Sequence, residues 1–307
     1  MQIIRQHALG GPEVLEIEDL PRPEPGPGEV LVRQAAAGVN PVDWKVRTRG
    51  GFLGEPPFTV GWDVAGVVEE GDGFAVGERV FGMPRFPEEA AAYAEYVAAP
   101  ADELARIPDG LSDVEAGALP LAGLTAWQAL VGVADVQPGQ RVLILAAAGG
   151  VGHLAVQIAK ARRAYVIGTA RLVKEAFLHE LGVDEAIDYT SVAVESVVSD
   201  VDLVLDLVGG DASAPTIACL RDGGLYIAVP SASALDRLNE LAGDRVRVTG
   251  ILVHPDRPGL EALAALTEAG QLKVTVEHTF PLEQAAKAHE WGETGRTQGK
   301  LVLTVES

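Results

Sequence analysis

Short apolar runs alternate with segments of helical spacing through the second half of the chain, between residues 141 and 251. Short continuous apolar runs are typical of buried strands, whereas apolar positions three and four apart indicate helices. The pattern predicts strands at 141–146, 164–169, 185–188, 201–207, 224–229 and 246–251. It predicts helices near 151–162, 172–181, 212–220 and 234–241. Parallel neighbours need such crossover connections, so we expect an α/β fold with a doubly wound, six-stranded parallel sheet of the Rossmann type.

The first 111 residues have a different pattern, with short strand-like runs interrupted by glycine and proline. The expected strands are 1–8, 14–17, 29–36, 64–69 and 78–81, and the stretch 93–97 is also typical of a strand. Turns at this density predict a mostly antiparallel barrel or sandwich. The connections from Asn40 to Phe58 and from Phe81 to Ala92 are expected to be loops that shape the pocket.

The pattern changes near Ser112, where Ser112 and Glu115 have the spacing of a capping box that opens a helix running toward Ala129. After Val253 the expected elements are a helix near 259–269, a strand at 272–279, a helix near 282–291 and a strand at 299–305. This tail is too short for its own core. We therefore expect one domain formed by 1–111 and 254–307, a second formed by 112–253, and a cleft between them.

Composition excludes several kinds of protein. Lys and Arg number 24 against 44 Asp and Glu, a formal charge of −20, which disfavours binding to nucleic acid and to anionic membranes. The single cysteine, Cys219, permits neither an internal disulfide nor a thiolate metal cluster within one chain. No apolar run has transmembrane length and the N-terminus lacks the features of a signal peptide, so we expect a cytoplasmic protein.

A glycine turn follows the first strand of the predicted parallel sheet, in the stretch Ala147-Ala148-Gly149-Gly150-Val151-Gly152. A strand that ends in such a turn directs the first amides of the next helix at one point, where the helix dipole favours a pyrophosphate. The first glycine of the usual G-x-G-x-x-G pattern is Ala147 here, so the signal is moderate and an ordinary strand-to-helix turn is the alternative.

The second strand of that sheet ends without the carboxylate that an NAD-specific site places there for the ribose hydroxyls. The sequence is Gly168-Thr169-Ala170-Arg171, with Lys174 one helical turn later. Small residues leave room for a 2′-phosphate, and the two cations could bind it, which favours NADPH. The alternative is that both are solvated residues at a helix start.

Several stretches together resemble the zinc-independent quinone oxidoreductase branch, the zeta-crystallin-like group, of the medium-chain dehydrogenase/reductase superfamily. They are Ala37–Lys45, Gly61–Gly66, Leu121–Trp127, Ala147–Gly152, Leu181–Asp184, Ile187–Tyr189 and Gly299–Leu303. The resemblance covers the whole chain. It implies a Rossmann domain beside a GroES-like, mostly antiparallel β-barrel domain, a homodimer, and hydride transfer from NADPH to a quinone or a small α,β-unsaturated carbonyl compound.

The resemblance also bears on zinc. Zinc-containing members of the superfamily carry a cysteine where this chain has Asn40, and a His-Glu pair where it has Trp62 and Asp63. Zinc needs several nitrogen or sulfur donors, and an amide, an indole and one carboxylate do not supply them. We therefore predict no metal. Reduction of a conjugated double bond needs instead a positioned hydride and a donor to the developing enolate oxygen.

The cofactor residues are partly implied by the resemblance and partly by their position after successive strands. The predicted set is Asn40, Lys45, Thr125, Ala148, Gly149, Gly150, Val151, Gly152, Thr169, Ala170, Arg171, Lys174, Tyr189, Val208, Val229, Leu252 and Val253. A packed aromatic residue is an equal alternative for Tyr189.

No general acid can be assigned from the sequence. Asn40 and Tyr93 are weak candidates for catalysis, Asp43 is more typical of a hydrogen-bonded turn carboxylate, and water is a further candidate for the acid. A planar substrate could contact Trp44, Phe52, Trp62 and Met83. Aromatic residues in a small barrel are more often part of the core.

Two other functions stay open from the sequence. One is an enoyl-thioester reductase of a biosynthetic pathway, which the acidic charge makes less favourable because carrier proteins are themselves acidic. The other is a protein that binds or senses NADPH without turnover. Oxidation of NADPH across a panel of quinones and enones would distinguish them.

Overall fold

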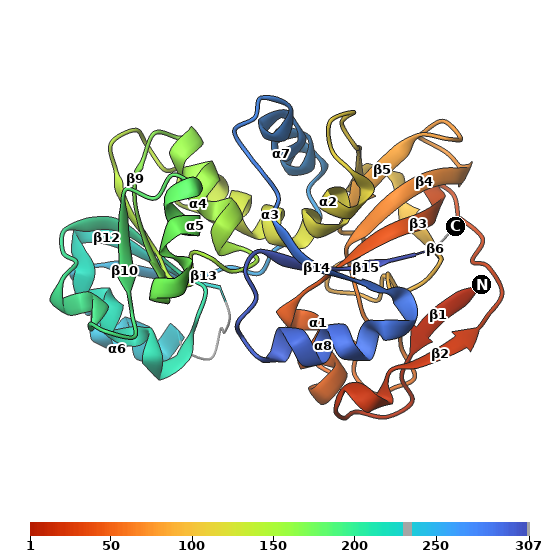
Figure 1. The fold of residues 1–307 in the computed structure, drawn as a ribbon, viewed down its shortest axis with the longest axis horizontal. Coiled ribbons are helices and arrows are strands. Elements are labelled where there is room, and N and C mark those ends of the chain that lie inside the picture. Colours follow the sequence, from red (N-terminus) through yellow and green to blue (C-terminus); the bar gives the residue numbers. More distant parts are fainter. Residues whose placement is uncertain (230–234, 306–307) are drawn as a thin grey trace. The chain divides into compact units, whose positions relative to one another are not determined.

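The structure, a computed structural model, describes residues 1–229 and 235–305 (Figure 1). Its internal contacts divide the chain into two units. The antiparallel unit contains Met1–Leu124, Val253–Gly270 and the described residues from Val274 onward. The parallel unit contains Thr125–Leu252 and Gln271–Lys273. The domain bounds expected from the sequence, 1–111 with 254–307 and 112–253, stay a prediction.

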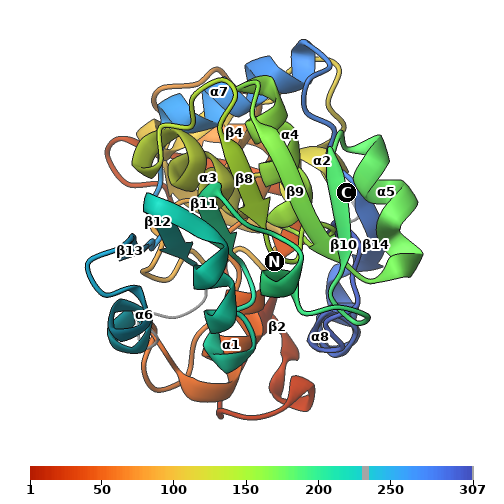
Figure 2. The ribbon, with the colours of Figure 1, turned by 90° about the vertical axis from the view of Figure 1, so that its left-hand side faces the viewer.

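The parallel unit is built on a six-stranded sheet. Its strands are β8 (Arg141–Ile144), β9 (Tyr165–Ala170), β10 (Glu185–Asp188), β11 (Val201–Asp206), β12 (Leu220–Ala228) and β13 (Arg247–Gly250). Their order is β10-β9-β8-β11-β12-β13 and all neighbours are parallel (Figure 2). The chain reverses its direction of travel across the sheet between β8 and β11, and ligands bind such sheets beyond the carboxyl ends at that point. The predicted Rossmann-type sheet and its six strands are confirmed.

Helices connect these strands. They are α4 (Gly152–Ala161), α5 (Glu175–Glu180) and α6 (Leu235–Ala242), with 3₁₀ segments η4 (Leu172–Lys174), η5 (Val194–Ser196), η6 (Gly210–Ala212) and η7 (Ala214–Cys219). The α-helix predicted at 212–220 is wrong, because Pro215 supplies no N–H and two 3₁₀ segments form there instead. The helix predicted at 234–241 begins at Ala234, which lies outside the described residues; the rest is confirmed as α6.

The antiparallel unit contains a seven-stranded sheet and a separate pair of strands. The pair is β1 (Gln2–Arg5) and β2 (Glu16–Asp19). The larger sheet has β3 (Glu29–Val39), β4 (Val64–Gly71), β5 (Arg79–Gly82), β6 (Tyr96–Pro100), β7 (Leu104–Arg106), β14 (Val276–Pro281) and β15 (Lys300–Thr304). Its order is β14-β15-β3-β4-β5-β7 with β6 on β3, and only β14 and β15 are parallel among its described pairs. The sheet is mostly antiparallel, as predicted, and β15 from the C-terminal tail pairs with β3.

The remaining helices are α1 (Pro41–Arg49), α2 (Asp113–Ala118), α3 (Pro120–Trp127), α7 (Arg257–Glu268) and α8 (Ala285–Glu293). Short segments are η1 (Pro12–Val14), η2 (Ala101–Glu103), η9 (Leu282–Gln284) and a π-helix, η3 (Gln128–Val133). The capping box is confirmed, since the Glu115 N–H donates to the Ser112 hydroxyl (3.3 Å). The single helix expected from there to Ala129 is wrong: Pro120 lacks an N–H, and the helix is interrupted before it.

Helix α1 occupies residues that were expected to be loop. Asn40 precedes Pro41, a favoured first helical residue, and the backbone N–H of Asn40 donates to the Asp43 carboxylate (2.7 Å). The strand expected at 93–97 is also partly wrong, since β6 begins only at Tyr96.

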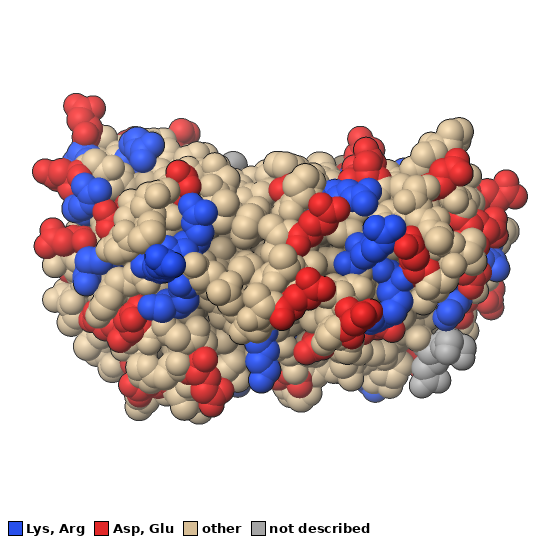
Figure 3. All heavy atoms as spheres, turned by 90° about the horizontal axis from the view of Figure 1, so that it is seen from above, with Lys and Arg blue, Asp and Glu red and all other residues tan. Residues whose placement is uncertain are grey.

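Charged side chains of both signs are distributed over the face shown in Figure 3. The formal charge of −20 therefore does not make that face uniformly acidic. Among the described residues, no helix has the length and apolar character needed to cross a membrane.

Candidate functional site

A tight turn joins β8 to α4 at the carboxyl end of the parallel sheet. Two hydrogen bonds fix it to β9: the Ala147 N–H donates to the Thr169 carbonyl (2.9 Å), and the Ala146 N–H donates to the Thr169 hydroxyl (3.1 Å). Ala146 adopts a positive φ of 52°. Thr169, one of the predicted cofactor residues, is buried and uses its side chain to hold the turn.

Gly152 allows α4 to begin close to this turn. A Cβ atom at Gly152 would lie 2.3 Å from the Ala146 carbonyl oxygen, so a side chain there would displace the first helical turn. The first amides of α4 and the positive end of its dipole therefore stay at this edge of the sheet, an arrangement that suits a pyrophosphate. The other predicted turn residues are buried Ala148 and half-buried Gly149, Gly150 and Val151.

Asp206 organises the loop after the neighbouring strand β11. One carboxylate oxygen accepts the N–H groups of Val208 and Gly209 (2.9 Å each), and the other accepts the hydroxyls of Ser213 (2.7 Å) and Tyr226 (2.9 Å). Burial, followed by the charge of Asp206, raises the pKa of Tyr226. The sequence prediction missed Asp206. The available signal was a carboxylate at the last position of a buried strand, followed by glycines.

The predicted residues after the later strands have different environments. Val208 and Leu252 are 49% and 56% exposed, and Val229 is half-buried with its N–H bonded to the Asp206 carbonyl (3.0 Å). Val208, Val229 and Leu252 follow β11, β12 and β13, whose carboxyl ends lie along the same edge of the sheet as the glycine turn. Val253 is buried and belongs to the antiparallel unit.

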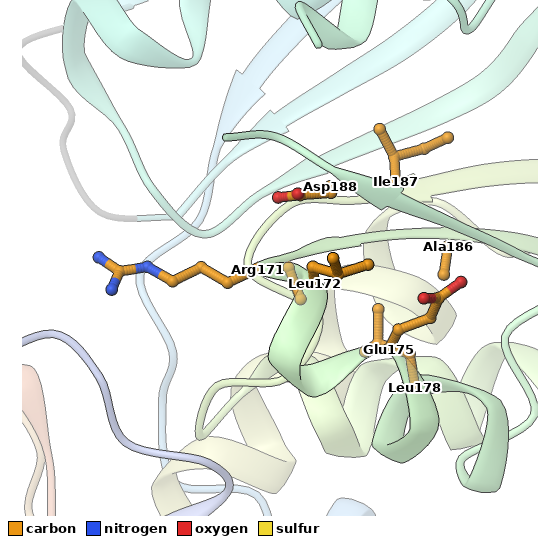
Figure 4. Close-up of a pocket in the computed structure, with 8 residues that line it drawn as sticks. Arg171, Leu172, Glu175, Leu178, Ala186, Ile187 and Asp188 are labelled. Atoms are coloured by element: carbon orange, nitrogen blue, oxygen red, sulfur yellow. The ribbon is translucent and has the colours of Figure 1, made fainter. Parts of the chain in front are cut away.

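A pocket of about 130 Å³ lies near the carboxyl ends of β9 and β10 (Figure 4). Its lining is Ala170, Arg171, Leu172, Glu175, Leu178, Ala186, Ile187 and Asp188. Arg171 is held by a neighbour, because its Nε donates to the hydroxyl of half-exposed Tyr189 (3.2 Å). The structure thus brings together the predicted Ala170, Arg171 and Tyr189. Lys174 is half-buried in η4 and is not part of the lining.

Two carboxylates in this lining, Glu175 and Asp188, were missed from the sequence. The prediction considered only the end of β9, where no carboxylate stands. In the sheet, Asp188 at the end of β10 is the register partner of Ala170 at the end of β9. Strand pairing therefore brings an acidic side chain to the pocket from a different strand.

The antiparallel unit holds a buried ammonium group, that of Lys300. Its Nζ donates to the Val39 carbonyl (3.2 Å) and to Asn40 Oδ1, and lies 3.8 Å from Asp63 Oδ2. Because an ammonium only donates and a carboxylate only accepts, the Asn40 amide must turn its Nδ2 toward Asp63 Oδ2 (2.7 Å). The other Asp63 oxygen accepts the Leu121 N–H (2.7 Å). Burial raises the pKa of Asp63 and lowers that of Lys300, and their mutual attraction opposes both shifts.

Asp43 lies on the other side of Asn40. Its Oδ2 accepts the Asn40 N–H (2.7 Å) and the Tyr93 hydroxyl (2.8 Å), whereas its buried Oδ1 has no hydrogen-bond partner. Burial raises the pKa of Asp43 to about 7. Asp43 is thus a hydrogen-bonded carboxylate, as predicted, but it lies at the start of α1 and not in the expected turn. Burial also raises the pKa of Tyr93 well above its usual value, and its hydroxyl is committed to Asp43.

His289 on α8 connects Tyr93 to Arg47 on α1. Its Nδ1 lies 3.0 Å from Arg47 Nη1, and its Nε2 lies 3.1 Å from the Tyr93 hydroxyl oxygen. An arginine can only donate, so Nδ1 accepts and the Nε2 hydrogen is donated to Tyr93. Burial, with the Arg47 charge second, lowers the pKa of His289 to about 3. Arg47 also donates to Glu293 (2.7 Å).

The predicted substrate residues do not form one surface. Phe52 is 51% exposed and its ring packs edge-on against Phe86 (5.7 Å between centroids), which packs against Trp62 (5.3 Å). Trp62 and Met83 are fully buried. Trp44 packs elsewhere, against α8. Phe86 was missed because the sequence gives no indication that it lies between the other two rings.

Two further predicted cofactor residues lie outside these clusters. Lys45 is exposed on α1, and Thr125 is buried in α3.

Comparison with known proteins identifies the family. Residues 26–109 match the model described as alcohol dehydrogenase GroES-like domain, and residues 181–303 match the one described as zinc-binding dehydrogenase. A 2-haloacrylate reductase from a Burkholderia species is 35% identical, over 97% of this chain and 97% of its own length. Mouse quinone oxidoreductase is 32% identical, over 99% of this chain and 97% of its own length. The chain belongs to the quinone oxidoreductase branch of the medium-chain dehydrogenase/reductase superfamily.

Solved structures agree with this membership. The quinone oxidoreductase of Coxiella burnetii is 37% identical with a TM-score of 0.94, and the match covers 100% of this chain and 99% of that one. Escherichia coli quinone oxidoreductase, solved in complex with NADPH, is 28% identical with a TM-score of 0.88, over 99% of this chain and 100% of its own.

The donor groups at the positions of the zinc ligands of the superfamily do not suit zinc. The Asn40 amide and the Asp63 carboxylate are turned toward the Lys300 ammonium, whose charge repels a metal cation. The Trp62 indole, which has no lone pair to offer, donates to the Glu88 carbonyl (2.7 Å). Across the part of the chain that the structure describes, no group of three or more His, Cys, Asp or Glu side chains is placed to hold a metal.

Proposed function

We propose that this chain is a zinc-independent, NADPH-dependent reductase that transfers a hydride to a quinone or a small α,β-unsaturated carbonyl compound. The observation that carries the proposal is a dinucleotide-type turn in a family member in which two of the metal-ligand positions, Asn40 and Asp63, face a lysine ammonium. The relative named 2-haloacrylate reductase and the structural neighbours named quinone oxidoreductase support this choice of reaction. The NADPH in the E. coli neighbour supports the choice of cofactor.

The residues of the parallel unit would bind the cofactor. The amides at the start of α4 would hold its pyrophosphate, and Arg171 would meet its 2′-phosphate. We keep the remaining predicted cofactor residues in the proposal: Asn40, Lys45, Thr125, Thr169, Ala170, Lys174, Tyr189, Val208, Val229, Leu252 and Val253. Phe52, with Phe86 behind it, is the exposed aromatic candidate for substrate contact, and Trp44, Trp62 and Met83 are kept as its predicted companions.

When bound, NADPH supplies a hydride from nicotinamide C4, and one proton completes the two-electron reduction. In an enone, the hydride goes to the β-carbon and negative charge develops on the carbonyl oxygen. The side chains of Asn40 and Tyr93 are already hydrogen bonded inside the antiparallel unit. We therefore propose water as the proton donor.

The test measures NADPH oxidation and binding with a panel of quinones, enones and a 2-haloacrylate, with NADH as the comparison cofactor. We expect oxidation of NADPH with at least one class, unchanged after prolonged dialysis against a chelator. Failure both to bind and to oxidise NADPH with every member of the panel would overturn the proposal. Activity lost to the chelator and restored by zinc would overturn its metal-free part.

We also propose a homodimer, as the resemblance to the family implies, and a cytoplasmic location, as the sequence predicts. Strand β13 lies at an edge of the parallel sheet and offers backbone groups to a second copy. Light scattering on the purified chain tests the dimer, and a single-chain mass at micromolar concentration would contradict it.

A further inference from the structure

The pocket beyond β9 and β10 carries more negative than positive charge. Its ionisable lining residues are Arg171 from the end of β9, Glu175 from α5 and Asp188 from the end of β10. Figure 4 shows Arg171 extending away from the other two. A 2′-phosphate adds nearly two more negative charges, so its binding there is opposed by both carboxylates.

Asp188 is held in place as a charged group. One oxygen accepts the N–H and the hydroxyl of Thr190 (3.0 and 2.7 Å). These bonds, led by the Thr190 hydroxyl, lower the pKa of Asp188. The side chain is therefore ionised and fixed at neutral pH.

Asp188 lies beside the end of β9. It is the register partner of Ala170, the residue before Arg171, and all three residues line the pocket. Rossmann sheets that bind NAD place a carboxylate for the ribose hydroxyls at the end of the second strand. Here that strand, β9, ends without a carboxylate, and Asp188 brings one to the same pocket from the end of β10.

We infer that Asp188 is a specificity-determining residue that supplies an acceptor for the unphosphorylated ribose of NADH and limits the preference for NADPH. This inference rests on the proposed function and deepens it. The chain is expected to use both cofactors, with Arg171 favouring NADPH and Asp188 opposing that preference.

The main experiment compares the wild type with Asp188→Asn. Asparagine keeps an oxygen for Thr190 and removes the charge. We expect the ratio of kcat/KM for NADPH to that for NADH to rise roughly tenfold, and to rise more at low salt. Glu180→Gln is the matched control, since it removes one exposed charge from α5 outside the pocket lining, and its ratio should stay at the wild-type value.

A binding measurement separates this inference from the proposed reaction. Adenosine 2′,5′-bisphosphate and 5′-AMP carry the two ribose forms without nicotinamide. Asp188→Asn should tighten the first and weaken the second, and Asp188→Ser, a smaller replacement, should do the same if the asparagine variant does not fold. An unchanged or reduced preference for the 2′-phosphate in folded variants would overturn the inference. A wild type that binds these probes but oxidises neither cofactor would instead contradict the proposed function.

Discussion

Asp43 and His289 should make the stability of the folded chain respond to pH in opposite directions. Both contact the Tyr93 hydroxyl, Asp43 as acceptor and His289 as donor. Burial raises the pKa of Asp43 from 3.8 to about 7 and lowers that of His289 from 6.5 to about 3. The same interior therefore favours the neutral form of each group.

The signs follow from proton linkage. For Asp43 the folded chain binds the proton more tightly, so its contribution is complete below pH 3.8 and is lost as the pH rises through about 7. For His289 the unfolded chain binds the proton more tightly, so its contribution is complete above pH 6.5 and is lost as the pH falls toward about 3. Between pH 3.8 and 6.5 the two slopes oppose each other.

The magnitudes are similar. One pKa unit corresponds to about 1.4 kcal/mol, so Asp43 contributes on the order of 4 kcal/mol and His289 on the order of 5 kcal/mol across their full ranges. In the wild type the pH dependences that Asp43 and His289 give to the free energy of unfolding nearly cancel between pH 3.8 and 6.5. Asp43→Asn should leave a free energy of unfolding that rises by about 1.4 kcal/mol per pH unit relative to the wild type, and His289→Gln should leave one that falls by a similar amount.

Urea unfolding at a series of pH values between 3.8 and 6.5 measures these slopes. Comparing each variant with the wild type removes the contributions of the other acidic groups. Asp102→Asn, which removes an exposed carboxylate from the same unit, is the control and should give a slope difference near zero. If both core variants keep the wild-type dependence on pH, the interior does not favour the neutral forms and the reasoning fails.

Three further predictions concern other parts of the site. Lys300→Met should lower the free energy of unfolding by about 3–5 kcal/mol, because it leaves Asp63 buried without its cation; a loss below about 1 kcal/mol in urea unfolding would contradict this. Gly152→Ala places a Cβ against the Ala146 carbonyl oxygen and should weaken NADPH binding by roughly tenfold or more in a fluorescence titration, with the fold retained by circular dichroism. Arg171→Gln should raise the KM for NADPH roughly tenfold and leave that for NADH nearly unchanged, and equal effects on both would show that Arg171 does not read the 2′-phosphate.

The parallel sheet could be predicted from sequence because its strands are buried on both faces and appear as continuous apolar runs. Helix α1 could not, because its apolar residues are not gathered on one side. Its only local signals are Asn40, Pro41 and Asp43, which mark a helix start but not its length. A helix that is stabilised by side-chain contacts to distant residues has little hydrophobic periodicity in its own sequence.

The candidate site likewise has one part that could be predicted from the sequence and another that could not. The glycine turn and Arg171 lie within about one strand-helix-strand unit, and their order along the chain already indicates a dinucleotide. The Lys300–Asn40 contact joins residues 260 apart, and Arg47 and His289 are 242 apart. Asp188 reaches the pocket only through the register of two strands. Local patterns cannot give such contacts, because they depend on the completed topology.

Hydrogen bonds link Lys300 to Arg47 through the buried residues Asn40, Asp43, Tyr93 and His289. This network also explains why a single substitution would not create a metal site. Lys300 at one end and Arg47 at the other can only donate hydrogen bonds, so they fix the orientation of the groups between them. Replacing Asn40 by cysteine would supply one thiolate, but the Lys300 ammonium would still face Asp63 and would pair with the new anion. The Trp62 indole would still offer no lone pair. A zinc ion therefore requires at least three substitutions, at positions 40, 62 and 300, and the lysine must be removed before any donor can bind a cation.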